Sequence, residues 1–150
     1  MTYLYRETQP CDAIDCVKIL RDWAEGCPWM PKLDDRQPME EYWCHVFETD
    51  MAWVAQQNNQ IVGFCVRNRG DENNIGALYV ASKARNRGIG KRLLDLAKGN
   101  CNHITVWAYE DNLQARKFYH REGLIEVSRE FDNEINLVDI EHRWTRPNSS

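Results

Sequence analysis

The sequence lacks the features that would assign it to a membrane or to nucleic acid. No run approaches the 18 consecutive apolar residues of a membrane-spanning helix, and the N-terminus has no basic stretch followed by an apolar run. The 19 Lys and Arg residues and 23 Asp and Glu residues are mixed along the chain, and they leave a net charge of -4 with no basic stripe. We therefore expect a cytoplasmic protein that binds neither membranes nor nucleic acid.

The chain also lacks the cysteine and histidine spacing of a metal or disulfide site. Its six cysteines include no C-x-x-C pair, and its four histidines are scattered. Cys16 falls on an apolar helical stripe and Cys65 lies inside a strand-like run, so both are interpreted as small buried hydrophobes. We expect reduced thiols and no metal site.

Length and composition favour one domain, because 150 residues with 43% hydrophobic content can build one core. Hydrophobic periodicity predicts strands over 3–7, 52–56, 61–67, 75–81, 103–107, 124–128 and 137–144. It predicts helices after Asp12, after Pro38, from Ile89 onward and after Asp111 or Asn112. The strand, turn, helix and strand that run from 75 to 107 should place their two strands parallel.

The most informative segment is the basic turn 85–90, which joins a strand to an amphipathic helix. Gly88 and Gly90 lack Cβ atoms where the backbone must approach a ligand, and the start of the helix offers unpaired N–H groups. Such a site suits a pyrophosphate. The pattern G-x-x-x-x-G-K-[ST] does not fit, because Arg92 stands where it requires Ser or Thr. The pattern G-x-G-x-x-G does not fit, because Leu93 stands where it requires the third glycine.

The remaining pattern, R-x-x-G-x-G, resembles the cofactor motif [QR]-x-x-G-x-[GA] of the GCN5-related N-acetyltransferases, the GNAT family. Its matching residues are Arg85, Gly88 and Gly90. The family's second signature, N-x-x-A-x-x-x-Y followed by a glycine, matches Asn112, Ala115, Tyr119 and Gly123. The resemblance extends over nearly the whole chain, because the predicted elements follow the family's order.

The chain also resembles one subgroup of this family, which has a W-x-P loop after the first helix. That loop corresponds here to 29–31, and the subgroup's terminal residues correspond to Asn133-Glu134, Asp139 and Arg143-Trp144. Ser82 and Leu124 depart from the family, which often has proline and phenylalanine at these positions. Neither position supplies chemistry.

The resemblance implies an α/β (α+β) fold in which residues 1–150 form a single N-acetyltransferase domain. The sheet is expected to be mixed and mainly antiparallel, with six or seven strands and helices on both faces. In the family the fourth strand splays from the fifth at a β-bulge, and acetyl-CoA lies in the gap. The corresponding cofactor-binding residues are Tyr79, Val80, Arg85, Asn86, Arg87, Gly88, Ile89, Gly90, Lys91 and Asn112.

For catalysis, the resemblance implies that Tyr119 is the acid that protonates the departing thiolate. Tyr119 could instead be a core tyrosine, and Asn112 could be a helix cap as well as a cofactor contact. The general base stays open. Its candidates are Glu72, Glu110, Glu134 and Asp139, or a water held by polar groups.

The acceptor is expected to be a primary amine on a small cationic molecule, because aromatic walls with carboxylates suit such a ligand. The residues proposed for this site are Trp29, Met30, Trp43, Trp107, Glu134 and Asp139. Two alternatives stay open: acetylation of a protein N-terminus or lysine, and a noncatalytic acyl-CoA-binding module. A homodimer is the assembly expected on general grounds.

Overall fold

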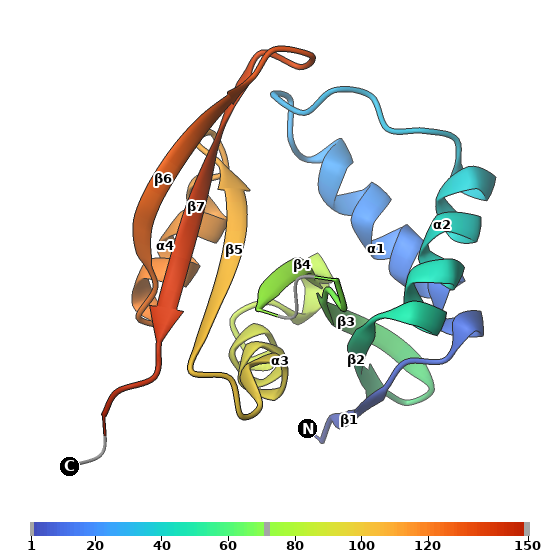
Figure 1. The fold of residues 1–150 in the computed structure, drawn as a ribbon. Coiled ribbons are helices and arrows are strands. Elements are labelled where there is room, and N and C mark those ends of the chain that lie inside the picture. The colour runs from blue at the N-terminus through green and yellow to red at the C-terminus, as the bar shows by residue number, and fades with distance from the viewer. Residues whose placement is uncertain (1, 71–72, 149–150) are drawn as a thin grey trace.

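The computed structural model describes residues 2–70 and 73–148, which form a seven-stranded sheet with helices on both faces (Figure 1). Its strands are β1 (Leu4–Glu7), β2 (Met51–Gln57), β3 (Gln60–Arg67), β4 (Asn74–Val80), β5 (His103–Tyr109), β6 (Ile125–Asp132) and β7 (Leu137–Thr145). Its helices are α1 (Ala13–Glu25), α2 (Arg36–Thr49), α3 (Ile89–Lys98) and α4 (Leu113–Arg121), with single 3-10 turns at Pro10–Asp12 and Ser82–Ala84. The strand order is β1-β2-β3-β4-β5-β7-β6, and β4 pairs with β5 in parallel while the other neighbours are antiparallel. The expected mixed, mainly antiparallel sheet is confirmed.

Two elements differ clearly from their predicted ranges. Helix α2 begins at Arg36 and takes Pro38 into its first turn, where a helix does not need the N–H group that proline lacks. Strand β6 extends to Asp132, although the prediction ended it at Ser128. Its side chains are almost all exposed, so pairing with β7 maintains the strand without a buried apolar face.

The helices cover opposite faces of the sheet. On one face, α1 and α2 pack over β2, β3 and β4 around Phe64. On the other face, α3 buries Ile89, Leu93, Leu94 and Ala97, each at most 1% exposed. Each such Leu or Ile side chain contributes about 1.5–3 kcal/mol to folding, so the sheet fixes α3 and its N-terminus firmly. Within the described ranges, no helix has the length and apolar character needed to cross a membrane.

The sheet splits between β4 and β5 (Figure 1). Among the described residues, only two pairs join these strands in register, Asn74 with Thr105 and Ile75 with Val106. On the other side of β4, Arg67 pairs with Ile75 and Val66 pairs with Ala77, so Gly76 is an extra, bulged residue. A Cβ atom at Gly76 would collide with the side-chain oxygen of Asn68, so any other residue there would require the Asn68 side chain to move. The bulge turns β4 away from β5 and opens the gap.

Candidate active site

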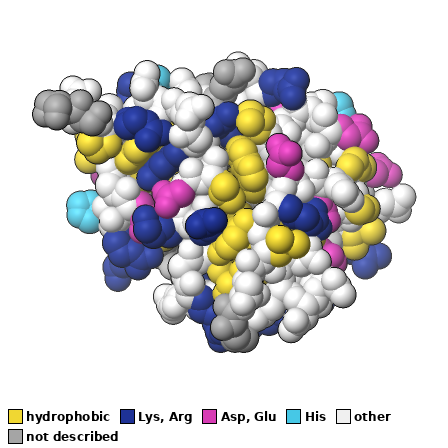
Figure 2. All heavy atoms as spheres, turned by 90° about the horizontal axis from the view of Figure 1, so that it is seen from below, with side chains coloured by type: hydrophobic (Ala, Val, Ile, Leu, Met, Phe, Trp, Pro, Cys, Tyr) yellow, Lys and Arg dark blue, Asp and Glu magenta, His cyan; other side chains and the backbone are white. Residues whose placement is uncertain are grey.

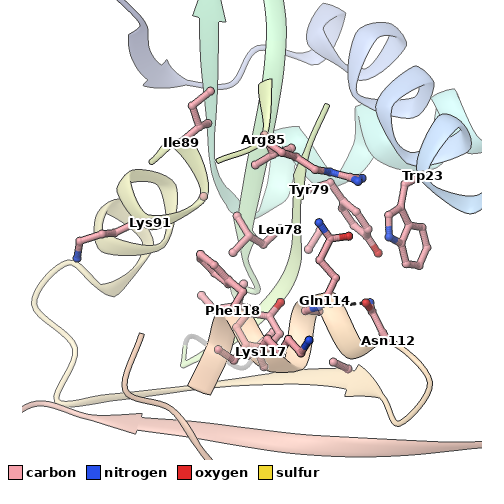
Figure 3. Close-up of a pocket in the computed structure, with 18 of the residues that line it drawn as sticks. Trp23, Leu78, Tyr79, Arg85, Ile89, Lys91, Asn112, Gln114, Lys117 and Phe118 are labelled. Atoms are coloured by element: carbon pink, nitrogen blue, oxygen red, sulfur yellow. Dashed lines mark hydrogen bonds between the residues drawn. The ribbon is translucent and has the colours of Figure 1, made fainter. Parts of the chain in front are cut away.

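A cavity of about 650 Å³ lies in the gap between β4 and β5 (Figure 3). Its walls come from both strands, from the turn before α3 and from α4. Beyond Ile75, β4 has no partner on its β5 side within the described residues, so its backbone donors and acceptors face the gap. An extended ligand could pair with this strand edge, which includes Tyr79 and Val80, as an added strand would.

The turn before α3 presents backbone N–H groups at one end of this cavity. Asn86 and Gly88 both have positive φ angles, 63° and 82°, and Gly88 caps α3. The first backbone bond inside α3 runs from Arg92 N–H to the Gly88 carbonyl, so the amides up to Lys91 have no helical acceptor. Consecutive free N–H groups at a helix start form a site for an anion.

The two glycines of the turn are needed for different reasons. Gly88 adopts a backbone conformation that side chains disfavour, and a Cβ atom there would meet no atom within 4 Å. Gly90 instead packs closely, because its Cβ atom would lie 3.3 Å from the Phe118 ring of α4. Gly90 therefore keeps α3 and α4 close, and Gly88 shapes the anion site itself.

The charged side chains that line the cavity are positive among the described residues. Four cationic side chains line it, Arg85, Lys91, Lys117 and Arg121, and none of the described lining residues is acidic. Figure 2 shows a band of hydrophobic side chains across the face seen from below, with Lys and Arg side chains on both sides of it. In a chain of net charge -4, this lining favours an anionic ligand.

Asn112 caps α4 and also lines the cavity. Its side-chain oxygen accepts a hydrogen bond of 3.2 Å from the Ala115 backbone and caps α4. Asn112 also lines the cavity, where Figure 3 places it beside Gln114. Because the oxygen is used by the cap, the side-chain NH2 group is the part available to a ligand.

Tyr119 lies in the cavity wall and is only 5% exposed. Within the described part of the chain, its hydroxyl has no hydrogen-bond partner, although the ring packs against Phe118 and His142. Burial raises the pKa of Tyr119, with further contributions from Tyr79 and Cys65. The phenol therefore keeps its proton at neutral pH, as a general acid must.

A chain of aromatic rings connects the two halves of the split sheet. Tyr79 of β4 contacts Trp23 of α1 at 5.1 Å between ring centroids, and Trp23 contacts Trp29 at 6.0 Å. Trp29 then reaches Tyr109 of β5 at 6.1 Å. Burial raises the pKa of Tyr79 to about 12, so this phenol is neutral at physiological pH. The chain forms an aromatic wall that links β4 to β5 through α1 and the loop after it.

Carboxylates from the β6–β7 hairpin lie near the Tyr109 end of this wall. Burial raises the pKa of Tyr109, and Asp139 and Asp132 raise it further. Burial likewise raises the pKa of Asp139, with additional repulsion from Glu130 and Asp132. Among the described residues these three carboxylates form no ion pair, unlike Glu126 and Glu110.

The predicted acceptor residues are only partly brought together. Trp29 is in the aromatic wall, with Met30 beside it in the loop, and Trp107 lines the cavity. Trp43 does not line the cavity; its ring packs 5.6 Å from Phe64 in the core between α2 and the sheet. The amphipathic pattern of α2 could not distinguish a core aromatic from a site aromatic.

The predicted carboxylates are also dispersed. Glu134 lies exposed in the turn between β6 and β7, while Asp139 faces Tyr109. Glu110 pairs with Arg129 and is not a cavity residue, and Glu72 lies outside the described residues. Arg87 is exposed beside the cavity lining.

Several cavity residues were not singled out from the sequence. They are Trp23, Leu78, Gln114, Lys117, Phe118 and Arg121. Lys117 and Arg121 are four residues apart, which places both on one side of α4 and could have signalled a basic helix face. Trp23 had no local signal, because its role depends on the contact with Tyr79 across the fold.

The family model for the acetyltransferase (GNAT) domain matches residues 48–124, which are just over half of the chain. The peptidyl-lysine N-acetyltransferase YiaC of Escherichia coli is 31% identical over 92 residues, covering 61% of this chain and 62% of YiaC. A relative from Mycobacterium tuberculosis is 33% identical over 97 residues, covering 60% of this chain and 56% of the relative. The matches thus span less than two thirds of the length of each relative.

Solved structures have the same fold. The apo form of YjaB from Escherichia coli has a TM-score of 0.77 at 20% identity, covering 95% of this chain and 97% of YjaB. A Bacillus anthracis protein in complex with acetyl coenzyme A is 28% identical with a TM-score of 0.59, covering 65% of this chain and 63% of that protein.

Proposed function

This chain belongs to the GNAT acetyltransferase family, and we propose that it transfers the acetyl group of acetyl-CoA to a primary amine. The observation that carries the proposal is the gap between β4 and β5, which combines a free strand edge, an anion site and a buried phenol in one cavity. We further propose that residues 1–150 act as one N-acetyltransferase domain.

Acetyl-CoA fits this cavity in charge and shape. Its pyrophosphate would lie on the free amides of the turn from Arg87 to Lys91, where the lining is cationic. Its extended pantetheine arm would pair with the free edge of β4 at Tyr79 and Val80, and Asn112 would donate its side-chain NH2 group. The Bacillus anthracis structure, solved in complex with acetyl coenzyme A, supports acetyl-CoA as the ligand.

Tyr119 supplies the proton that the reaction needs on the thiol side. Acetyl-CoA brings a thioester, from which the amine takes the acetyl group while a thiolate leaves. The buried Tyr119 hydroxyl keeps its proton and lies in the cavity wall, so it can donate that proton to sulfur. An amine with a pKa near 10.4 must lose a proton before it attacks, which costs about 4.6 kcal/mol at pH 7. Because no described lining residue is acidic, we assign no carboxylate as the base.

The acceptor is proposed to be a small cationic amine that enters at the aromatic wall. Trp29 and Tyr109 offer ring faces, and Asp139 with its neighbouring carboxylates offers negative charge that no described cation balances. A cation gains from both features. A lysine side chain of a protein is the second candidate, because the relative YiaC is a peptidyl-lysine N-acetyltransferase.

The proposal is tested by incubating the protein with acetyl-CoA and separate panels of polyamines, amino acids, aminoglycosides and lysine peptides, with free thiol as the readout. Amine-dependent release of thiol, together with mass-spectrometric detection of the acetylated amine, is the expected result. Binding of acetyl-CoA without turnover on any panel would instead identify a noncatalytic acyl-CoA-binding module. Efficient turnover of lysine peptides but not of small amines would reverse the order of the two acceptor candidates.

Replacing Asp139 with Asn tests the acceptor site. We expect KM for a cationic amine to rise about tenfold, because the loss of a charge-assisted contact is worth on the order of 1.4 kcal/mol. The Kd for acetyl-CoA should not change, since Asp139 does not line the cavity. The matched control is Glu48→Gln, which makes the same charge change at an exposed position of α2. Equal KM values in the two variants would remove Asp139 from the acceptor site.

A further inference from the structure

His142 of β7 is a buried polar side chain that the proposed chemistry does not use. It is 2% exposed, and its neighbours on the same face of the strand are the apolar Ile140 and Trp144. Both ring nitrogens are enclosed, and neither makes a hydrogen bond with the described residues. Backbone groups of Val106 and Ile140 lie near the ring without reaching hydrogen-bond geometry. An unpaired buried polar group is costly, so an apolar residue would serve simple packing better.

The aromatic neighbour of His142 is Tyr119. The two ring centroids are 5.4 Å apart, and the ring planes are inclined by 50°. Tyr119 lines the cavity, whereas His142 does not. The imidazole therefore contacts the phenol from outside the cavity lining, and together the two rings form part of the contact between α4 and β7.

Burial, more than the surrounding charge, opposes the protonation of His142. Helix α4 contributes Tyr119 and Arg116, β6 contributes Glu126, and β5 contributes the apolar partner Val106. Glu126 is already paired with Arg116 at 2.9 Å, so it is not free to balance an imidazolium. Burial lowers the pKa of His142 below its usual 6.5, and Arg116 acts in the same direction while Glu126 opposes it. At neutral pH the ring is uncharged.

The folded protein therefore resists protonation of His142 at a pH where the unfolded chain accepts it. The stability associated with the neutral ring is fully present above the unfolded pKa of about 6.5, and it is lost as the pH falls toward the lower folded pKa. Protonation of the folded form would place an uncompensated charge between α4 and the sheet.

We propose that His142 is a positioning residue for Tyr119, whose neutral ring holds the phenol of α4 in the cavity wall and whose protonation releases it. The inference rests on the proposed role of Tyr119 as the acid. It makes the geometry of that acid depend on pH through a residue that does not line the acetyl-CoA cavity.

A spectroscopic test needs no enzymatic turnover. The protein is labelled with 3-fluorotyrosine, the Tyr119 resonance is assigned with Tyr119→Phe, and its ¹⁹F shift is followed from about pH 8 to about pH 5. One titration step with a midpoint below the usual histidine pKa is expected in the wild type. His142→Phe and His142→Gln should each abolish this step. His103→Gln is the matched control and should keep it, since His103 lies on β5 hydrogen-bonded to Asn73.

A kinetic test shows whether the same step affects catalysis. The ratio of kcat for the wild type to kcat for His142→Phe cancels the ionisation of the amine, which both proteins share. This ratio should fall about tenfold per pH unit below the ¹⁹F midpoint, while the Kd for acetyl-CoA stays equal in both. His142→Gln replaces His142→Phe if the latter does not fold.

Different results would contradict the positioning role of His142 and the proposed acetyl transfer. A flat Tyr119 resonance in the wild type, or a step that persists in both His142 variants, overturns the positioning role even if acetyl transfer is normal. Absence of acetyl transfer on every amine panel contradicts the proposed function, while the ¹⁹F titration still decides whether His142 controls Tyr119. A kcat ratio that does not change with pH also overturns the inference.

Discussion

Tyr119→Phe is expected to lower kcat by about 10²- to 10⁴-fold and to leave the Kd for acetyl-CoA within about twofold. The substitution keeps the ring that packs on Phe118 and His142, and it removes only the hydroxyl that would protonate the thiolate. That hydroxyl has no hydrogen-bond partner among the described residues, so the free energy of unfolding should not fall. Single-turnover kinetics, calorimetry and thermal unfolding on one preparation measure the three quantities.

The control for this variant is Tyr5→Phe, which makes the same change in a partly buried tyrosine of β1 outside the cavity lining. It should retain wild-type kcat. A hydroxyl that only anchors acetyl-CoA would give the reverse pattern for Tyr119→Phe, with weaker binding and a nearly normal single-turnover rate. Undiminished chemistry in Tyr119→Phe would remove Tyr119 as the acid.

Gly88→Val is expected to abolish measurable binding of acetyl-CoA while the protein stays folded. The φ angle of 82° at Gly88 disfavours any side chain, and a β-branched one most of all, so the turn must rearrange. In addition, the valine side chain would stand at the start of α3, where the pyrophosphate would approach the free amides. Calorimetric titration should show at least about a hundredfold loss of affinity, which corresponds to about 2.7 kcal/mol.

Gly99→Val provides the matched control for Gly88→Val. Gly99 also has a positive φ angle, 47°, but it caps the other end of α3 and does not line the cavity. A Cβ atom there would meet the flexible end of Arg67 at 3.3 Å, so some loss of stability is expected. The affinity of Gly99→Val for acetyl-CoA should remain near the wild-type value. Equal affinities in all three proteins would contradict the assignment of the anion site.

Local sequence signals were sufficient for the elements that form the anion site. The spacing of Ile89, Leu93, Leu94 and Ala97 predicted α3, and all four side chains are buried in the structure. The glycines of the preceding turn were correctly placed at the helix start. These predictions depend on backbone conformation and on the period of the helix, and both can be read from neighbouring residues.

Tertiary contacts were not predictable in the same way. The contact between Trp23 and Tyr79 and the contact between Trp29 and Tyr109 join residues that are distant in sequence. Trp43 was proposed for the acceptor site, but its helix turns it toward Phe64. Any large aromatic residue on the apolar face of α2 would have produced the same pattern, whether it faced the core or the site.

The unpaired nitrogens of His142 also had no signal in the sequence. His142 appeared as one of four scattered histidines, and its position on β7 gave no sign of a contact with Tyr119. Only the packing of α4 against β7 brings these two rings together. Burial of a polar group is a property of the assembled fold, and it cannot be deduced from spacing in one strand.

We propose that acetyl-CoA binds in the split between β4 and β5 with its pyrophosphate at the start of α3. Titration of acetyl-CoA into ¹⁵N-labelled protein, with the backbone amide resonances followed by NMR, locates the bound cofactor. We expect the largest shifts at the amides from Arg87 to Lys91, with further shifts at Tyr79, Val80 and Asn112. Saturable shifts confined to other parts of the protein, or no shifts at millimolar acetyl-CoA, would contradict it.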